Sequence, residues 1–77
     1  MDLSREFTEQ AGDKVIKFHV TYDMKTHHFA VVEDDSRTYT LKYDIPTRRW
    51  STEDGSEPGI AIDKLALLVQ QSFGVFV

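Results

Sequence analysis

Two stretches that align without gaps decide the fold: FHVTYDMKTHHFAV at residues 18–31 and YTLKYDIPTRRWST at residues 39–52. Each begins with an aromatic residue and alternates polar and aliphatic residues up to a Tyr-Asp pair. Each then has two variable residues, a threonine, two basic residues and an aromatic residue. An alternating run, a turn and a second run is the pattern of a β-hairpin. The chain is therefore predicted to contain two similar hairpins in tandem.

Alternation also predicts which side chains share a face of the sheet. The apolar side chains of residues 14–22 fall on one face: Ile16, Phe18, Val20 and Tyr22. With a first turn at residues 23–26, we expect these cross-strand pairs: Tyr22 with His27, Val20 with Phe29 and Phe18 with Val31. The apolar faces of the two strands then coincide, which supports this register. In the second hairpin Trp50 is expected to pair with Leu41 on the core side.

The remaining segments complete an α+β domain. Residues 1–12 are expected to form either a loose arm or a short edge strand that turns at Gly12-Asp13. Residues 33–36 read as a turn and residues 51–59 as a loop, after which Ile60 and Ile62 are candidates for a short strand. Helical spacing of apolar residues predicts a helix over residues 64–73, with Asp63 as its N-cap and Gly74 just beyond its end. We therefore expect an antiparallel β-meander of four to five strands with one C-terminal helix packed on one face, as a single domain over residues 13–77.

The composition of the chain limits the classes of function that it can have. The 77 residues carry a net charge of −4 and no cysteine, so disulfides and thiolate chemistry are excluded. No apolar run approaches the roughly 20 residues that a membrane helix needs, and the charged N-terminus is not that of a signal peptide. We expect a cytoplasmic protein that does not enter a membrane.

The charges are segregated along the chain. In the four strands predicted from residue 14 onward, the basic residues outnumber the acids, which gather in turns, the arm and the long loop. The face away from the helix is therefore expected to be basic and polar. Local potential steers a charged ligand more than net charge does, so a nucleic-acid-binding surface is one interpretation, with these residues: Lys17, His28, Lys42, Arg48 and Arg49. The other interpretation is an ordinary solvated face, as antiparallel sheets usually have.

Residues 43–62 resemble part of a known family. Asp44-Ile45, Trp50, Gly55, Pro58-Gly59, Ile60 and Ile62 occur in the order found in the single-stranded-DNA-binding transcriptional coactivators related to positive cofactor four. The resemblance implies a dimer whose curved sheet binds single strands through basic and aromatic residues, here Arg48, Arg49 and Trp50. This chain departs from the family pattern at Pro46-Thr47, which stand where an arginine is expected.

Other chemistry has little support in the sequence. His19 and His28 are expected to be diagonal neighbours on the open face, but two imidazoles without a third ligand make a poor zinc site, so we expect no metal and no cofactor. No nucleophile motif or phosphate-binding loop is present, so we do not expect an enzyme. The apolar terminus Val75-Phe76-Val77 is a candidate protein interface.

Two hypotheses for function remain. The first is a small non-catalytic interaction protein that binds a protein partner or itself as a homodimer. The second is a single-stranded nucleic-acid-binding protein that uses the open face of the sheet.

Overall fold

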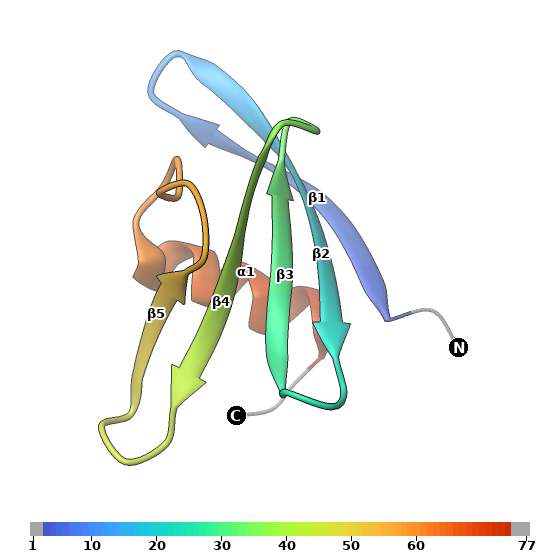
Figure 1. Ribbon diagram of the computed structural model, residues 1–77. Coiled ribbons are helices and arrows are strands. Elements are labelled where there is room, and N and C mark those ends of the chain that lie inside the picture. The colour runs from blue at the N-terminus through green and yellow to red at the C-terminus, as the bar shows by residue number, and fades with distance from the viewer. Residues whose placement is uncertain (1–2, 75–77) are drawn as a thin grey trace.

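The computed structural model describes residues 3–74, which form five strands and one helix (Figure 1). The elements follow one another along the chain: β1 (Ser4–Ala11), β2 (Lys14–Asp23), β3 (His28–Glu33), β4 (Arg37–Asp44), β5 (Arg49–Glu53) and α1 (Ile62–Phe73). The order of the strands in the sheet is the order in the chain, and every neighbouring pair is antiparallel. The prediction of an α+β antiparallel meander with a C-terminal helix is confirmed.

Residues Ser4–Ala11, for which an arm or an edge strand was expected, form the edge strand β1. It pairs with β2 along its whole length, from Ser4 opposite Thr21 to Ala11 opposite Lys14. The two-residue connection Gly12-Asp13 joins the strands. The side chains of β1 alternate between the two faces of the sheet, which explains why this segment forms a strand. Phe7 and Ala11 pack against the core, while Glu6 and Thr8 are exposed.

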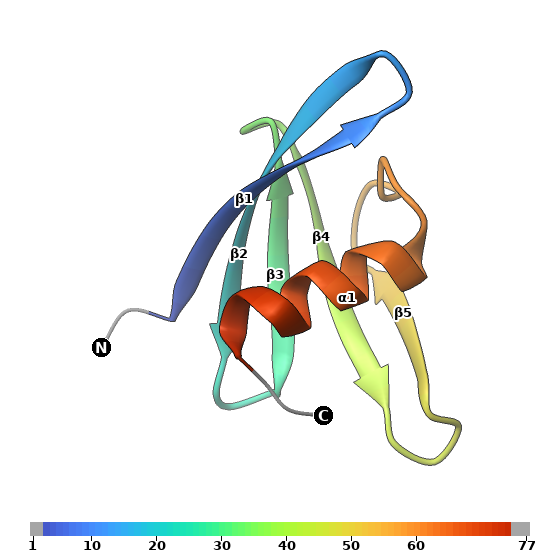
Figure 2. The same ribbon diagram turned by 180° about the vertical axis from the view of Figure 1, so that it is seen from behind.

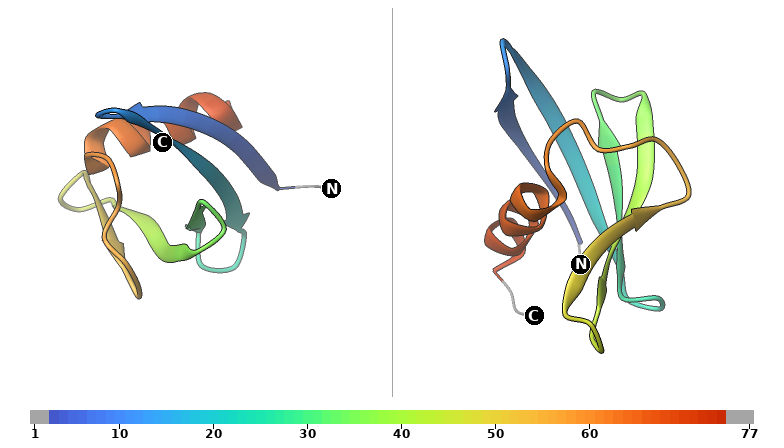
Figure 3. Two further views of the ribbon diagram at one scale, coloured as in Figure 1. Left: turned by 90° about the horizontal axis from the view of Figure 1, so that it is seen from above. Right: turned by 90° about the vertical axis from the view of Figure 1, so that its left-hand side faces the viewer.

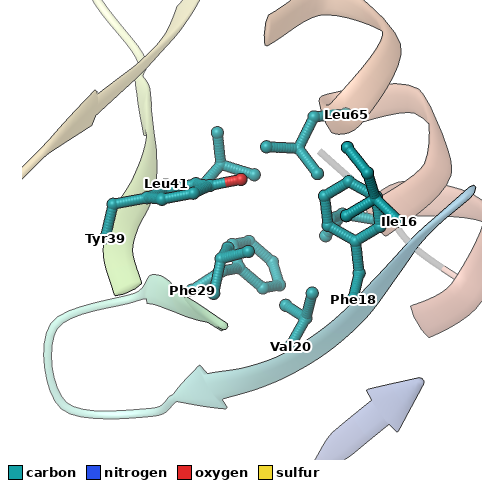
Figure 4. Close-up of a cluster of buried hydrophobic side chains, with 9 residues drawn as sticks. Ile16, Phe18, Val20, Phe29, Tyr39, Leu41 and Leu65 are labelled. Atoms are coloured by element: carbon teal, nitrogen blue, oxygen red, sulfur yellow. The ribbon is translucent and has the colours of Figure 1, made fainter. Parts of the chain in front are cut away.

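The helix and the sheet form two layers around one core (Figure 2). The two views of Figure 3 show that the sheet is strongly twisted and that α1 lies against its concave side, where it contacts both edge strands, β1 and β5. The core consists of apolar side chains from β2, β3, β4 and α1 that point toward one another (Figure 4): Ile16, Phe18, Val20, Phe29, Val31, Tyr39, Leu41, Leu65 and Val69. Burial of this cluster is the main stabilising contribution that the fold offers.

The register of both hairpins differs from the prediction by two residues. Val20 lies opposite Val31 and Tyr22 opposite Phe29, while Trp50 lies opposite Tyr43 rather than Leu41. The reason is the conformation of the turns. The last turn residue is left-handed in both cases, with φ of 62° at His27 and 56° at Arg48, so the strands resume one residue later than expected. Because side chains alternate with a period of two, a shift of two residues keeps every side chain on its predicted face.

The helix begins earlier than predicted. Its N-cap is Ala61, which offers no side-chain hydrogen bond, and its first backbone bond runs from the Leu65 N–H to the Ala61 carbonyl at 3.0 Å. Asp63 therefore lies within the first turn, where a carboxylate favours the helix dipole. The short strand predicted around Ile60 and Ile62 does not form, because both side chains instead pack onto the core. Gly74, at φ 69°, ends the helix in the left-handed conformation that glycine adopts most readily.

Candidate functional site

The two repeated turns lie at the same end of the sheet (Figure 1), which we call the turn end: residues 24–27 between β2 and β3, and residues 45–48 between β4 and β5. In the first turn the Asp23 carboxylate accepts the Lys25 N–H at 2.8 Å, and the His27 N–H donates to the Asp23 carbonyl at 2.8 Å. In the second, the Thr47 hydroxyl donates to the Asp44 carboxylate at 2.6 Å. The backbone bond from Lys25 lowers the pKa of Asp23. The aspartate of each Tyr-Asp pair therefore shapes its turn.

The first residue after each aspartate is apolar and exposed. Met24 is 65% exposed and Ile45 is 75% exposed, the two highest values among the large apolar side chains described. Their positions are equivalent in the repeat, so the two hairpins present them at the same end of the molecule. Neither side chain contributes to the core. Met24 and Ile45 are therefore exposed apolar side chains in two neighbouring turns at one end of the sheet.

A set of aromatic rings lies behind these side chains on the helix side of the sheet, and we call it the aromatic cluster: Tyr22, Phe29, Tyr43, Trp50 and Phe73. Centroids are 5.0 Å apart between Tyr22 and Phe29, 6.0 Å between Phe29 and Trp50 and 5.2 Å between Tyr43 and Trp50. Phe73 brings the end of the helix to within 5.4 Å of Phe29. Phe29 is buried, but the other four rings are only half-buried. The rings of the cluster therefore pack against one another and remain partly accessible.

Two arginines flank the aromatic cluster. Arg48 and Arg49 are exposed, and within residues 3–74 neither guanidinium has a hydrogen-bond or ion-pair partner. Together with Trp50 they line a shallow hollow of about 430 Å³, which the start of the helix closes with Ile62 and Asp63. The turn end thus combines apolar side chains, accessible aromatic rings and two arginines that are available to a ligand.

The open face of the sheet is mixed in charge rather than basic. β1 contributes Glu6, whose carboxylate lies 2.9 Å from His19 Nδ1, and β5 contributes Glu53, whose carboxylate lies 2.6 Å from Lys42 Nζ. The hydrogen bond to His19 lowers the pKa of Glu6. The Lys42–Glu53 contact lowers the pKa of Glu53 and raises that of Lys42. The prediction counted neither acid on this face, because β1 was treated as an arm and Glu53 as part of a loop.

The five residues predicted to bind nucleic acid lie in three places. His28 and Lys42 lie near the turn end on the open face, where His28 shares a hollow of about 370 Å³ with Asp23, Glu53 and Asp54. Arg48 and Arg49 lie at the turn end itself. Lys17 is separated from them, because it sits opposite Thr8 whereas His28 sits opposite Asp23. The candidate interface residues Val75, Phe76 and Val77 lie outside the described residues.

The histidines do not form the expected neighbouring pair. His19 lies opposite Val32, and His28 lies opposite Asp23, so the shifted register separates the two imidazoles along the sheet. His27 belongs to the turn, where its Nδ1 is 2.8 Å from the Tyr22 hydroxyl. Within residues 3–74, no group of three or more histidine, aspartate or glutamate side chains is placed to hold a metal ion.

Glu33 is a buried residue whose role the sequence analysis did not predict. It is the last residue of β3 and only 2% exposed, so the turn expected at residues 33–36 begins one residue later. Its carboxylate accepts the Tyr39 hydroxyl at 2.5 Å and the Gly59 N–H at 2.9 Å. Burial, with this bond, raises the pKa of Tyr39. Strict alternation from Phe29 and Val31 was the available signal, since it points Glu33 inward.

The chain passes close to Glu33 at Gly59, where a side chain would require its neighbours to shift. A Cβ atom at residue 59 would lie 2.6 Å from the Ile16 Cδ1 and 2.9 Å from the Glu33 Oε1. The Ser56 N–H, earlier in the same loop, donates to the Thr38 carbonyl at 3.0 Å. The loop between β5 and α1 is therefore attached to the sheet at two points.

Comparison of the chain with protein-family models, with curated proteins and with solved structures found no match. The resemblance of residues 43–62 to the coactivator family stays a prediction. The structure adds one limit of its own: no helix among the described residues has the length and apolar character needed to cross a membrane.

Proposed function

We propose that this protein is a small non-catalytic binding module that takes a protein partner at its turn end. The observation that carries the proposal is the exposure of Met24 and Ile45 at equivalent positions of two repeated hairpins, 65% and 75% respectively. Both could have been polar without loss to the core, since neither packs against it. Their apolar character is therefore better explained by a contact with another molecule.

The surroundings of Met24 and Ile45 suggest the chemistry of the partner. Aromatic residues, methionine and arginine are enriched at protein interfaces, and tryptophan, tyrosine and arginine dominate their binding energy. The turn end offers half-buried Trp50 and Tyr43 beside Arg48 and Arg49. The complementary partner would place an apolar side chain against Met24 and Ile45 and a carboxylate against the arginines.

The proposal is one of binding rather than catalysis. Side chains of methionine, isoleucine and arginine recognise a surface, but none of them transfers protons near neutral pH. The tyrosine and tryptophan rings are ordered by their mutual contacts. Ordered aromatic side chains lose little entropy on binding, so the surface is suited to recognition.

The test compares two double variants as baits. Met24→Asp with Ile45→Asp changes the turn end, whereas Val15→Asp with Leu67→Asp introduces the same charge at exposed apolar sites elsewhere, 59% and 50% exposed. Circular dichroism checks that both variants fold. Proteins that wild type and the second variant retain, and the first variant loses, are candidate partners, whose purified forms should change the fluorescence of Trp50 on titration. Retention of the same proteins by all three baits would contradict the proposal.

A second candidate function is single-stranded nucleic-acid binding, and the arrangement of Arg48, Arg49 and Trp50 favours it. Arginines beside an accessible aromatic ring suit phosphate contact and base stacking. In a titration with a short mixed-sequence single-stranded DNA, affinity should fall steeply as salt rises, because phosphate contacts release counterions. Arg48→Glu with Arg49→Glu should abolish binding, while Lys14→Glu with Arg37→Glu makes the same charge change at the other end of the sheet. Absence of amide shifts in wild type at low salt would exclude this candidate.

A further inference from the structure

Among residues 3–74, strand β1 pairs with another strand on one side only. It is an edge strand of eight residues, paired with β2 alone (Figure 1). The Leu3 carbonyl accepts the Tyr22 N–H at 3.0 Å, so odd-numbered residues direct their backbone groups toward β2. Antiparallel strands alternate this direction, so Glu6, Thr8 and Gln10 direct their backbone groups toward the edge of the sheet. An edge of this kind is a template for another strand.

We propose that β1 pairs with β1 of a second copy of this chain. Such a pair is antiparallel and symmetric, and it joins the two sheets into one across a two-fold axis. Placing the axis at Phe7 sets Arg5 opposite Glu9 of the second copy and Ser4 opposite Gln10 of the second copy. Glu6 then lies opposite Thr8 of the second copy. The two Glu6–Thr8 pairs alone form about four backbone hydrogen bonds in this register.

The charges of β1 select this register against its neighbours. Moving the axis to Glu6 would set the two Glu6 carboxylates opposite each other and Arg5 opposite Phe7. Moving it to Thr8 would set Phe7 opposite Glu9 and Arg5 opposite Ala11. Directly opposed like charges destabilise a strand pair and opposite charges stabilise it. Only the axis at Phe7 places Arg5 of each copy opposite Glu9 of the other and places the two Phe7 rings opposite each other.

Charged residues on an edge strand usually prevent association. In β1 the same charges are self-complementary, so they discourage other strands and other registers while permitting one partner, a second copy. This complementarity is the reason that we commit to self-pairing over addition of an unrelated strand. The surface lies on a different strand from the turn end, so the inference goes beyond the proposed function and does not rest on it.

The side chains that would meet across the axis are already held in place. The Arg5 Nε donates to the Ser72 carbonyl at 3.3 Å, and its guanidinium lies 5.2 Å from the centre of the Phe73 ring. On the same face, Glu9 lies 3.3 Å from Lys64 Nζ. Because the helix orients both charges along β1, less side-chain entropy is lost when the second copy adds its charges.

Phe7 supplies the apolar part of the contact. Its ring stacks on Phe18, with centroids 5.2 Å apart and planes 20° apart, yet it remains half-buried. A second Phe7 across the axis would cover the side of the ring that β1 leaves accessible, and aromatic pairs opposite one another stabilise antiparallel strands.

The test uses charge complementation between two variants, Arg5→Glu and Glu9→Arg. Each variant alone opposes like charges across the axis, so its homodimer should dissociate at least about tenfold more readily than that of wild type. An equal mixture of the two variants restores opposite charges at both pairs, and it should dimerise like wild type. Sedimentation equilibrium up to about 1 mM protein measures all three, since dimerisation follows mass action. Any effect of a variant on its own fold is the same alone and in the mixture.

Two results would overturn the proposal: a wild type that stays monomeric over the whole concentration range, or a mixture that dimerises no better than its components. The register has a separate readout, because the natural chain has no cysteine. Mixing Glu6→Cys with Thr8→Cys should form an intermolecular disulfide at least about tenfold faster than either variant alone, because opposite residues lie within disulfide distance. Equal rates would reject the axis at Phe7.

Discussion

At the scale of single residues, one buried carboxylate attaches the loop between β5 and α1 to the sheet. Glu33 receives the Tyr39 hydroxyl from β4 and the Gly59 N–H from the loop. Both donors are needed, because a carboxylate in an apolar environment is costly unless its oxygens are hydrogen-bonded. The start of the helix therefore depends on a residue far earlier in the chain.

Replacing Glu33 by glutamine should destabilise the protein by about 1–3 kcal/mol, because the new NH₂ group replaces an oxygen that accepts a hydrogen bond from Tyr39 or Gly59. Urea unfolding monitored by Trp50 fluorescence measures the loss. Hydrogen exchange of the Gly59 amide should also be faster in this variant than in wild type.

Glu57→Gln is the matched control for this change, because Glu57 lies exposed in the same loop and its replacement should alter stability by less than about 0.5 kcal/mol. Equal stability of the Glu33 variant and wild type would show that the buried carboxylate contributes nothing to the attachment of the loop.

At the scale of elements, the two turns show how one sequence pattern is used twice. Both follow a Tyr-Asp pair, both end in a left-handed residue, and each carries an aspartate that accepts a hydrogen bond inside the turn. These local bonds define the turn without any contribution from the core. Met24 and Ile45, the exposed residues that follow these aspartates, are not needed to define the turns, so their side chains are available for binding.

The hydrogen bond from the Lys25 N–H to the Asp23 carboxylate makes part of the free energy of unfolding depend on pH. The pKa of Asp23 is lowered below its ordinary value of 3.8, chiefly by the Lys25 N–H. Its contribution is therefore fully present above pH 3.8 and is lost as pH falls through the lowered folded-state pKa. Asp23→Asn should unfold at lower urea than wild type at neutral pH, and the difference should shrink in strong acid. Urea midpoints measured across this range check the prediction, and a difference that did not change with pH would contradict it.

At the scale of the whole molecule, one helix completes the core of a single twisted sheet. Leu65 and Val69 are fully buried against the strands, whereas Leu67 on the same helix is half exposed. Among residues 3–74, α1 is the only helix on the concave side of the sheet, and Ile60 in the loop before it also packs on the core. Stability of a domain this small, about 4–12 kcal/mol, therefore depends strongly on the helix.

Truncation of Leu65 to alanine should cost about 2–5 kcal/mol, through lost burial and the cavity that remains. Leu67→Ala on the exposed side of α1 should cost less than about 1 kcal/mol. Thermal unfolding by circular dichroism compares the two. If Leu65→Ala does not fold, Leu65→Val, expected to cost about 1 kcal/mol, gives the same ranking. A ranking with Leu67 as the more costly site would mean that α1 packs by a different face.

The alternation of apolar residues from Ile16 to Tyr22 and from Tyr39 to Tyr43 was sufficient to predict the strands, their inward faces and the meander. It was insufficient for register, because left-handed turn residues are usually glycine or asparagine and here are His27 and Arg48. The burial of Glu33 depends on Gly59, a contact between distant parts of the chain that no local pattern reveals. The sequence indicated part of the turn end, because the variable residues of the repeat include Met24 and Ile45. That these two side chains are exposed was known only from the structure.

The order of the strands has a consequence for how the chain folds. Every strand pairs with the strand next to it in sequence, so the sheet can grow hairpin by hairpin without closing a long loop. The contact of Arg5 with Ser72, in contrast, joins residues 67 positions apart. We expect hairpin formation to come early, and the docking of α1 against β1 to be the slow and final step, because it brings the two ends of the described chain together.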